Sequence, residues 1–275
     1  MASVLVTGLY LYPVKSLRGC AVPATEFDEL GLAGDRRFMV IDEAGKFLTQ
    51  RALPRMARVD TALTTDQLIL SADGAGRIAV PRAADPAAPL RTVGVWKSEG
   101  LLAEDCGDDV AAWLSGFLGG KCRLVRIGEK FARPVLKSAA HPGDVFSFAD
   151  GAPLLVAGEA SLADLNDRIQ AGGGEPVPMD RFRPNIVVTG CAPFAEDGWS
   201  HVRLGDVVLR SAGKSDRCIV TTTDQRTGER GKEPLHTLAT FRRDPVDPSS
   251  VYFGVNFINE SKRGTVRVGD AVAPL

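Results

Sequence analysis

Short apolar runs separated by turn sequences are the feature that most limits how this chain can fold. Residues 37–41 and 46–49 flank the turn at 42–45, and residues 66–70 and 77–80 flank a turn that contains two glycines. Two such runs joined by a few turn residues predict a β-hairpin. Many short strands at this spacing indicate a barrel or a sandwich and argue against a parallel sheet.

Two segments carry the spacing of amphipathic helices. Apolar residues recur every three or four positions from 110 to 118, after Asp109, which we expect to cap that helix. Ser161 and Asp164 form the pattern of a capping box at the start of a second helix, which we expect to end at Gly172. The chain then returns to predicted strands at residues 185–189, 202–210, 218–222 and 265–272.

The length of 275 residues suffices for two domains of ordinary size. Residues 119–133, after the first predicted helix, form the least structured joint in the sequence. We place the boundary there, with domains at residues 1–122 and 123–275. The predicted fold class is α+β and β-rich, with a few helices.

Composition and charge exclude several classes of protein. Lys plus Arg number 33 and Asp plus Glu 34, so the overall charge favours neither nucleic acid nor an anionic membrane surface. The first residues lack the basic n-region of a signal peptide, and no apolar run approaches the ~20 residues of a membrane helix. We therefore expect a cytoplasmic protein. Five cysteines without a Cys-x-x-Cys pair argue against a disulfide framework, a zinc knuckle and an iron–sulfur cluster.

Several catalytic motifs are absent from the sequence. It contains no P-loop, no Gly-x-Gly-x-x-Gly that opens a helix, and no Gly-x-Ser-x-Gly elbow. The three histidines are isolated, which argues against a His-rich metal site. A Cys–His nucleophilic pair stays open, although no local signature supports it.

Basic residues stand at the predicted strand ends, each close to Pro, Ser, Thr or Asn. They include Lys15, Arg36, Arg51, Arg183 and Arg217. The simpler interpretation is that strand ends meet water, where charged side chains are common. Several of them together also fit a convergent site for a phosphate or another anion.

Cys218 opens an apolar predicted strand and directly follows Arg217. A cationic neighbour favours the thiolate, which is the form that binds metal ions. A small buried cysteine at the start of a core strand is an equally good interpretation from the residues alone.

Six motifs occur in the order seen in MOSC-domain proteins. They are residues 12–16 (YPVKS), 34–38 (GDRRF), 158–166 (GEASLADLN), 182–186 (FRPNI), 217–218 (RC) and 264–270 (GTVRVGD). Over nearly its whole length the chain resembles the branch that includes the mitochondrial amidoxime-reducing component and its bacterial relatives. The resemblance implies an N-terminal MOSC-type β-barrel domain packed on a C-terminal MOSC β-barrel domain, with a molybdenum–molybdopterin cofactor between them.

The resemblance also implies roles for single residues. It makes Cys218 the catalytic cysteine, whose thiolate binds molybdenum while the pterin dithiolene supplies two more sulfurs. Lys15, Arg36 and Arg183 match basic positions that bind the pterin phosphate and nearby groups.

Polar positions complete the expected cofactor pocket. Ser161 and Asn185 match positions of the family's pocket, although Ser161 is also a helix cap by its pattern, and a helix N-terminus is itself a site for anions. Arg51 and Arg217 join the cofactor-binding set from the charge pattern more than from the resemblance.

The activity implied by the resemblance is reduction of small N-oxygenated (N-hydroxylated) molecules such as amidoximes and hydroxylamines. Some bacterial relatives carry a ferredoxin-like domain with four clustered cysteines, and this sequence has no such cluster. We therefore expect a separate electron-donor protein, either a flavin reductase or a haem or iron–sulfur carrier. The alternatives are a molybdenum-cofactor or sulfur carrier without turnover of its own, and a structural module without a cofactor.

Overall fold

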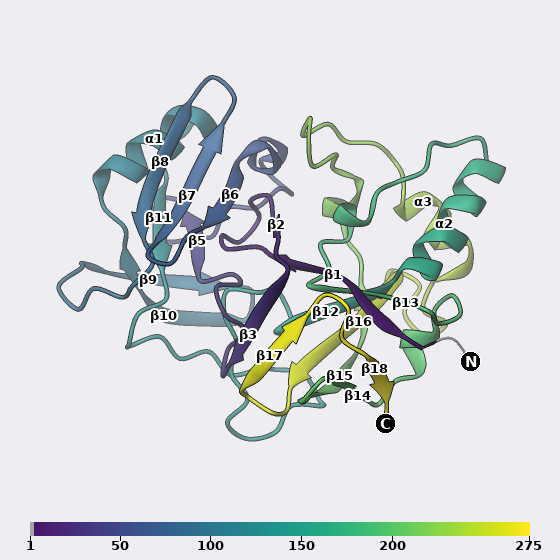
Figure 1. Ribbon diagram of the computed structural model, residues 1–275. Coiled ribbons are helices and arrows are strands. Elements are labelled where there is room, and N and C mark those ends of the chain that lie inside the picture. Colours follow the sequence, from purple (N-terminus) through teal and green to yellow (C-terminus); the bar gives the residue numbers. More distant parts are fainter. Residues whose placement is uncertain (1–2) are drawn as a thin grey trace.

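The computed structural model describes residues 3–275, in which strands dominate. Among these residues three α-helices lie against curled sheets: α1 (Asp108–Leu118), α2 (Glu159–Ala171) and α3 (Leu235–Phe241). Figure 1 shows two halves, one built mainly from the blue segments and one mainly from the green and yellow segments. The predicted α+β, β-rich fold class is confirmed. Within residues 3–275, every helix falls short of the length and apolar character of a membrane span.

An eight-stranded sheet is the main sheet of the green and yellow half, and it also includes the purple strands β1 and β2 (Figure 1). Its strands follow the order β18, β14, β15, β16, β12, β13, β1, β2, and β12 runs parallel to β13 whereas the other neighbours are antiparallel. The strands are β1 (Leu5–Leu11), β2 (Cys20–Ala21), β12 (Leu154–Gly158), β13 (Ile186–Thr189), β14 (His201–Leu204), β15 (Val207–Asp216), β16 (Tyr252–Asn259) and β18 (Val272–Pro274).

Three smaller sheets complete the fold. One has the order β5, β11, β10, β9, a second β6, β7, β8, and a third β17, β3, β4. Their strands are β3 (Ala24–Asp28), β4 (Gly31–Leu32), β5 (Phe38–Ile41), β6 (Asp60–Leu63), β7 (Gln67–Ala72), β8 (Gly76–Pro81), β9 (Leu90–Val95), β10 (Ser98–Asp105), β11 (Arg123–Arg126) and β17 (Gly264–Arg267). Short 3-10 helices are η1 (Pro54–Arg58), η2 (Met179–Arg181), η3 (Ala195–Gly198) and η4 (Ile219–Thr222).

The two halves share strands. β1 pairs with β13, with Leu9 opposite Ile186, and β3 pairs with β17. Conversely, β11 begins at Arg123, within the predicted C-terminal domain, and pairs with β5 and β10 of the N-terminal half. Strand pairing therefore crosses the division that we predicted between residues 122 and 123, and the start of the chain completes the sheets of the C-terminal half.

Each half has its own apolar core. Leu68 and Leu70 alternate with more exposed residues on β7 and pack in a cluster with Met56, all three fully buried. In the other half, Leu9 of β1 and Phe257 of β16 belong to one cluster. Burial of each such side chain contributes about 1.5–3 kcal/mol, so these cores hold the sheets that carry the site.

The predicted hairpins fare differently. The one at residues 66–80 is confirmed as β7 and β8, with Leu68 opposite Val80. In the predicted hairpin at residues 37–49, only the first arm is a strand, β5. Residues 46–49 form no strand and pair with β5 at a single bridge, between Phe47 and Ile41.

Both predicted helix caps are wrong. Asp109 lies within α1, which follows Gly107, while α2 follows Gly158, and neither helix has a side-chain cap. Ser161 lies inside α2, where its hydroxyl donates to Glu196 Oε1 at 2.8 Å. Glu196 is fully buried, and a buried carboxylate needs hydrogen-bond donors. The Ser161 hydroxyl therefore bonds to Glu196 and does not cap α2.

The predicted strand at residues 218–222 is also wrong, because residues 219–222 form η4. Thr221 Oγ1 donates to the carbonyl of Cys218 at 2.9 Å, and Thr222 Oγ1 donates to the carbonyl of Ile219 at 2.8 Å. Such local bonds from threonine hydroxyls to the backbone compete with a strand ladder. Cys218 therefore lies in the turn that joins β15 to η4.

Candidate functional site

A cavity of about 340 Å³ lies where the two halves meet, a size that suits a small molecule or cofactor. It brings together all but one of the predicted site residues: Lys15, Arg36, Arg51, Arg183, Asn185, Arg217 and Cys218. With Lys137, six cationic side chains line the cavity, against the two carboxylates of Asp150 and Asp216. The lining therefore suits an anionic ligand.

Cys218 is the cysteine of this cavity. Arg51 places its Nη2 at 3.1 Å from the Cys218 sulfur, within reach of a hydrogen bond to it. The other cysteines fit the simpler interpretation of small packed side chains. Cys106 and Cys122 pack against the core of the N-terminal half, and burial raises the pKa of the Cys106 thiol to about 12.

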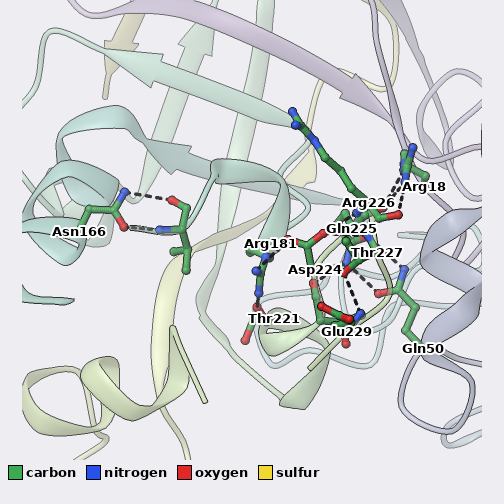
Figure 2. Close-up of polar contacts among 12 residues, drawn as sticks. Arg18, Gln50, Asn166, Arg181, Thr221, Asp224, Gln225, Arg226, Thr227 and Glu229 are labelled. Atoms are coloured by element: carbon green, nitrogen blue, oxygen red, sulfur yellow. Dashed lines mark hydrogen bonds and ion pairs between the residues drawn. The ribbon is translucent and has the colours of Figure 1, made fainter. Parts of the chain in front are cut away.

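The backbone of Arg51 is held by a loop from the C-terminal half. We call residues 223–231 the docking loop, and its Arg230 donates to the carbonyl of Arg51 at 2.6 Å. In Figure 2, Gln225 of this loop faces Gln50, and the two amides exchange hydrogen bonds of 3.1 and 3.0 Å. Both glutamines are buried, and Arg51 directly follows Gln50 in the chain. The glutamine pair therefore holds the backbone of Arg51 in place.

Two further contacts anchor the docking loop (Figure 2). Arg18 Nε donates to the carbonyl of Gln225 at 2.8 Å, and Arg181 forms an ion pair with Asp224 at 3.2 Å. Asp224 in turn accepts from the backbone N–H groups of Arg226 and Thr227. These bonds hold the loop in one conformation across the boundary between the halves.

Lys15 and Asp150 form an ion pair at the cavity wall. Lys15 is only 4% exposed, and its Nζ also donates to the carbonyl of Phe148 at 2.9 Å. Burial lowers the pKa of Lys15 to about 8, although Asp150 acts in the opposite direction. For Asp150, desolvation acts to raise the pKa, but the Lys15 ammonium, the Trp96 N–H and the Arg51 guanidinium together hold it well below its usual range.

Arg36 and Arg183 form a second cationic group around Tyr12. Their guanidinium carbons lie 4.4 and 4.2 Å from the centre of the Tyr12 ring. Arg36 also donates to Asn185 Oδ1 at 2.9 Å and to Asp35 at 2.6 Å. Burial lowers the pKa of Arg183 to about 10.

The backbone at these two arginines adds to the unusual environment. Arg36 has φ 48° and Arg183 has φ 55°, in the left-handed region that non-glycine residues rarely occupy. Such strain concentrates at functional sites, where surrounding structure holds it in place. Two like charges close to one ring also repel each other, and an anion bound nearby offsets that repulsion.

Arg217 lines the cavity as predicted, but its hydrogen bonds do not go to the Cys218 sulfur. Its guanidinium donates to Ser215 Oγ at 2.8 Å and to the carbonyl of Phe182 at 2.7 Å. Its Nε is buried without a partner, and burial lowers the pKa of the group. The contact to the Cys218 sulfur comes from Arg51, which the sequence predicted only through its charge.

Ser161 is the predicted residue that does not line the cavity. Its hydroxyl is committed to Glu196 and accepts from the backbone N–H of Phe194 at 2.8 Å. Asp150 also lines the cavity, and the sequence did not predict it. Its one local signal is its place before Gly151, and a lone carboxylate does not stand out among the cations that mark this site.

The donors around the cavity fit a molybdenum–pterin cofactor. The guanidinium groups of Arg36, Arg183 and Arg217 in the lining suit an anion, and a cysteine sulfur suits a soft metal. Among residues 3–275, no three His, Cys, Asp or Glu side chains come together as metal ligands.

Comparisons with known proteins cover nearly the whole chain. The model of the MOSC N-terminal beta barrel domain matches residues 3–121, and that of the MOSC domain matches residues 143–273. Mitochondrial amidoxime-reducing component 1 of Mus musculus is 37% identical over 282 residues, with 97% of this chain and 81% of that protein covered. The protein of the same name from Homo sapiens is 36% identical, with 97% and 82% covered. Mitochondrial amidoxime reducing component 2 of Rattus norvegicus is 35% identical, with the same shares covered.

Proposed function

Because this chain belongs to the family of MOSC-domain proteins with an N-terminal MOSC β-barrel domain, we propose that it is a molybdopterin-dependent N-reductase. The cavity around Cys218 is the site of its molybdenum cofactor, and the substrates are small N-oxygenated molecules. One observation carries the proposal: a single cysteine sulfur, contacted by Arg51, opens into a cavity lined by six cationic side chains.

The residues of the cavity divide into two groups. Cys218 provides the thiolate for molybdenum, with the Arg51 guanidinium at its sulfur. Arg36 and Arg183, held over Tyr12, bind the anionic part of the cofactor, and Asn185 orients Arg36. When bound, the cofactor supplies the two-electron redox chemistry.

Arg217 and Lys15 complete the cofactor site. The Arg217 side chain lines the cavity, and its charge favours the same anion. An ammonium has three N–H donors, and Lys15 uses two of them on Asp150 and Phe148, which leaves one. We do not include Ser161, because its hydroxyl is taken up by Glu196.

Protons are needed beside the electrons. Reduction of an N–OH group to N–H consumes two electrons and two protons and releases one water. Lys15 holds an exchangeable proton at Nζ, with a pKa of about 8, close to the pH at which a general acid is most effective. Asp150, whose side chain is 60% exposed, pairs with Lys15 and favours its charged, proton-bearing form.

Molybdenum content tests the proposal directly. The full chain, made in a host that produces the cofactor, is expected to contain about one molybdenum per chain. Cys218→Ser should lose the metal and the reduction of an amidoxime by a chemical reductant, with an unchanged circular dichroism spectrum. Cys191→Ser is the matched control, because Cys191 is half-buried outside the cavity. Full activity in Cys218→Ser would refute the proposal.

The second candidate is a carrier of the molybdenum cofactor or of sulfur. The exposed side of Asp150 shows that the cavity is open to solvent, which a carrier also requires. A carrier would bind molybdenum and pass it to an acceptor protein, but would not reduce N-oxygenated compounds with any donor. The two assays, metal content and N-reduction, therefore separate the candidates.

Electron supply and compartment belong to the same proposal. A separate flavin reductase, or a haem or iron–sulfur carrier, delivers the electrons, and addition of such purified donors to the N-reductase assay tests this. The relatives are named mitochondrial, whereas we predict a cytoplasmic protein, and fractionation of cells with a tagged full-length chain distinguishes the two.

A further inference from the structure

Trp96 occupies a strained turn beside the cavity. It joins β9 to β10, has φ 55°, and leaves 46% of its surface exposed. A bulky non-glycine side chain with this backbone is an outlier that persists only where its surroundings hold it. The contacts of the indole therefore indicate what the strain maintains.

The indole contacts two residues that line the cavity. Its Nε1 donates to Asp150 Oδ1 at 2.8 Å, and the guanidinium carbon of Arg51 lies 4.5 Å from the ring centre. Phe47 packs edge-on against the ring, with centroids 5.0 Å apart. A cation over an indole face is the strongest of the cation–π arrangements with aromatic side chains.

Arg133 holds two backbone segments in place: the β9–β10 hairpin, which carries Trp96, and the segment that leads to Asp150. It is a buried cation whose hydrogen bonds go to uncharged oxygens. Its Nε donates to Ser98 Oγ at 3.1 Å in the hairpin, and its Nη1 donates to the carbonyl of Ala149 at 2.5 Å. The hairpin and the segment before Asp150 are thus held at a set distance by one side chain.

A continuous series of contacts results. The Cys218 sulfur contacts Arg51, Arg51 stacks on Trp96, Trp96 bonds Asp150, and Asp150 pairs with Lys15. The docking loop fixes only the backbone of Arg51. Apart from the sulfur, the ring of Trp96 is the group that orients the Arg51 guanidinium among the contacts of residues 3–275.

We propose that Trp96 is a positioning residue, which orients Arg51 against the Cys218 sulfur and Asp150 against Lys15. The inference rests on the proposed function in one respect, namely that Cys218 and Asp150 serve N-reduction. The alternative role for an exposed indole is a wall on which flat substrates stack. The two roles differ in what they change: loss of positioning lowers kcat, whereas loss of a substrate wall raises KM.

The positioning itself can be measured without activity. Protons of the Arg51 side chain lie over the Trp96 ring and should show an upfield ring-current shift in NMR spectra of the full chain, whatever its molybdenum content. Arg51→Lys identifies the resonances. The shift should vanish in Trp96→Ala and persist in Trp96→Phe, because phenylalanine keeps a ring but lacks the N–H. An unchanged Arg51 spectrum in Trp96→Ala would overturn the proposal, even if the protein never bound molybdenum.

Kinetics of the molybdenum-loaded protein provide the second arm. Per bound molybdenum, Trp96→Ala should lower kcat about tenfold with little change in KM, and Trp96→Phe should recover at least about a third of the wild-type value. Trp113→Phe is the matched control, since Trp113 donates to the carbonyl of Ala75 and packs on Phe117, away from the cavity. A rise in KM with unchanged kcat in Trp96→Ala would refute positioning and assign Trp96 to the substrate wall.

Discussion

Replacement of Lys15 by methionine tests how the cavity holds its charge. Lys15 is 4% exposed, and burial lowers its pKa from 10.5 to about 8. The folded protein therefore binds the lysine proton more weakly than the unfolded chain does. Each unit of this shift corresponds to about 1.36 kcal/mol, so the charged form costs the folded state roughly 3 kcal/mol.

The sign follows from the number of protons bound. Between the folded pKa of about 8 and the unfolded pKa of 10.5, the unfolded chain binds more protons, so stability rises with pH. Integration of this difference from about pH 7 to about pH 9.5 gives a gain of about 2 kcal/mol in the free energy of unfolding. Lys15→Met should lack this gain, because methionine has a similar shape and no proton to lose.

Urea unfolding of both proteins at the two pH values measures the effect. The difference between wild type and Lys15→Met reports Lys15 together with its partner Asp150, since groups that do not contact Lys15 titrate alike in both. Asp150 adds no slope, because its pKa lies far below this window. Equal pH dependence of the two proteins would refute the reasoning, as would a gain for the wild type on going to lower pH.

Four other substitutions follow from the geometry. Arg183→Gln should lower the molybdenum content about tenfold or more without a change in the unfolding midpoint, because it removes a charged donor for the anion. Ser161→Ala should leave the molybdenum content unchanged but destabilise the fold by about 1–3 kcal/mol in urea, since Glu196 loses a donor. Gly254→Ala should cost at least about 2 kcal/mol by the same measurement, because its φ is 73° and a Cβ would lie 2.8 Å from the Val156 carbonyl oxygen. Leu70→Ala should cost about 2–5 kcal/mol and lower the thermal midpoint, as a large-to-small change in a fully buried position.

Sequence patterns correctly predicted the strands and helices whose structure depends on residues close together in the chain. The hairpin of β7 and β8 has both arms and its turn within one short stretch, and its alternating burial agrees with the sequence. The helices α1 and α2 likewise lie where apolar periodicity placed them. Their first residues could not be predicted, because the partner of Ser161 is Glu196, which lies 35 residues away.

Long-range contacts explain most of the rest. Charge predicted Lys15 and Arg51, and the resemblance and the neighbouring Arg217 predicted Cys218. Their convergence in one cavity depends on strands and loops far apart in the chain. Trp96 left no signal, because its role comes from a turn conformation and from two partners in other segments. Periodicity describes which side chains face inward, and it does not describe which strand lies beside another.

The shared strands also set the order of events while the chain is being made. β1 carries buried residues such as Val6 and Leu9, yet its partner β13 follows about 180 residues later. At roughly 5–20 residues per second, β1 waits on the order of 10–40 s after synthesis before β13 exists. During that interval an apolar strand with open backbone groups is exposed to other chains. The C-terminal half also depends on the start of the chain. Without the first 28 residues, β13 and β17 lack a partner strand and their backbone groups stay open. A fragment of residues 143–273 expressed alone should therefore aggregate, and supply of residues 3–28 as a peptide should restore its solubility.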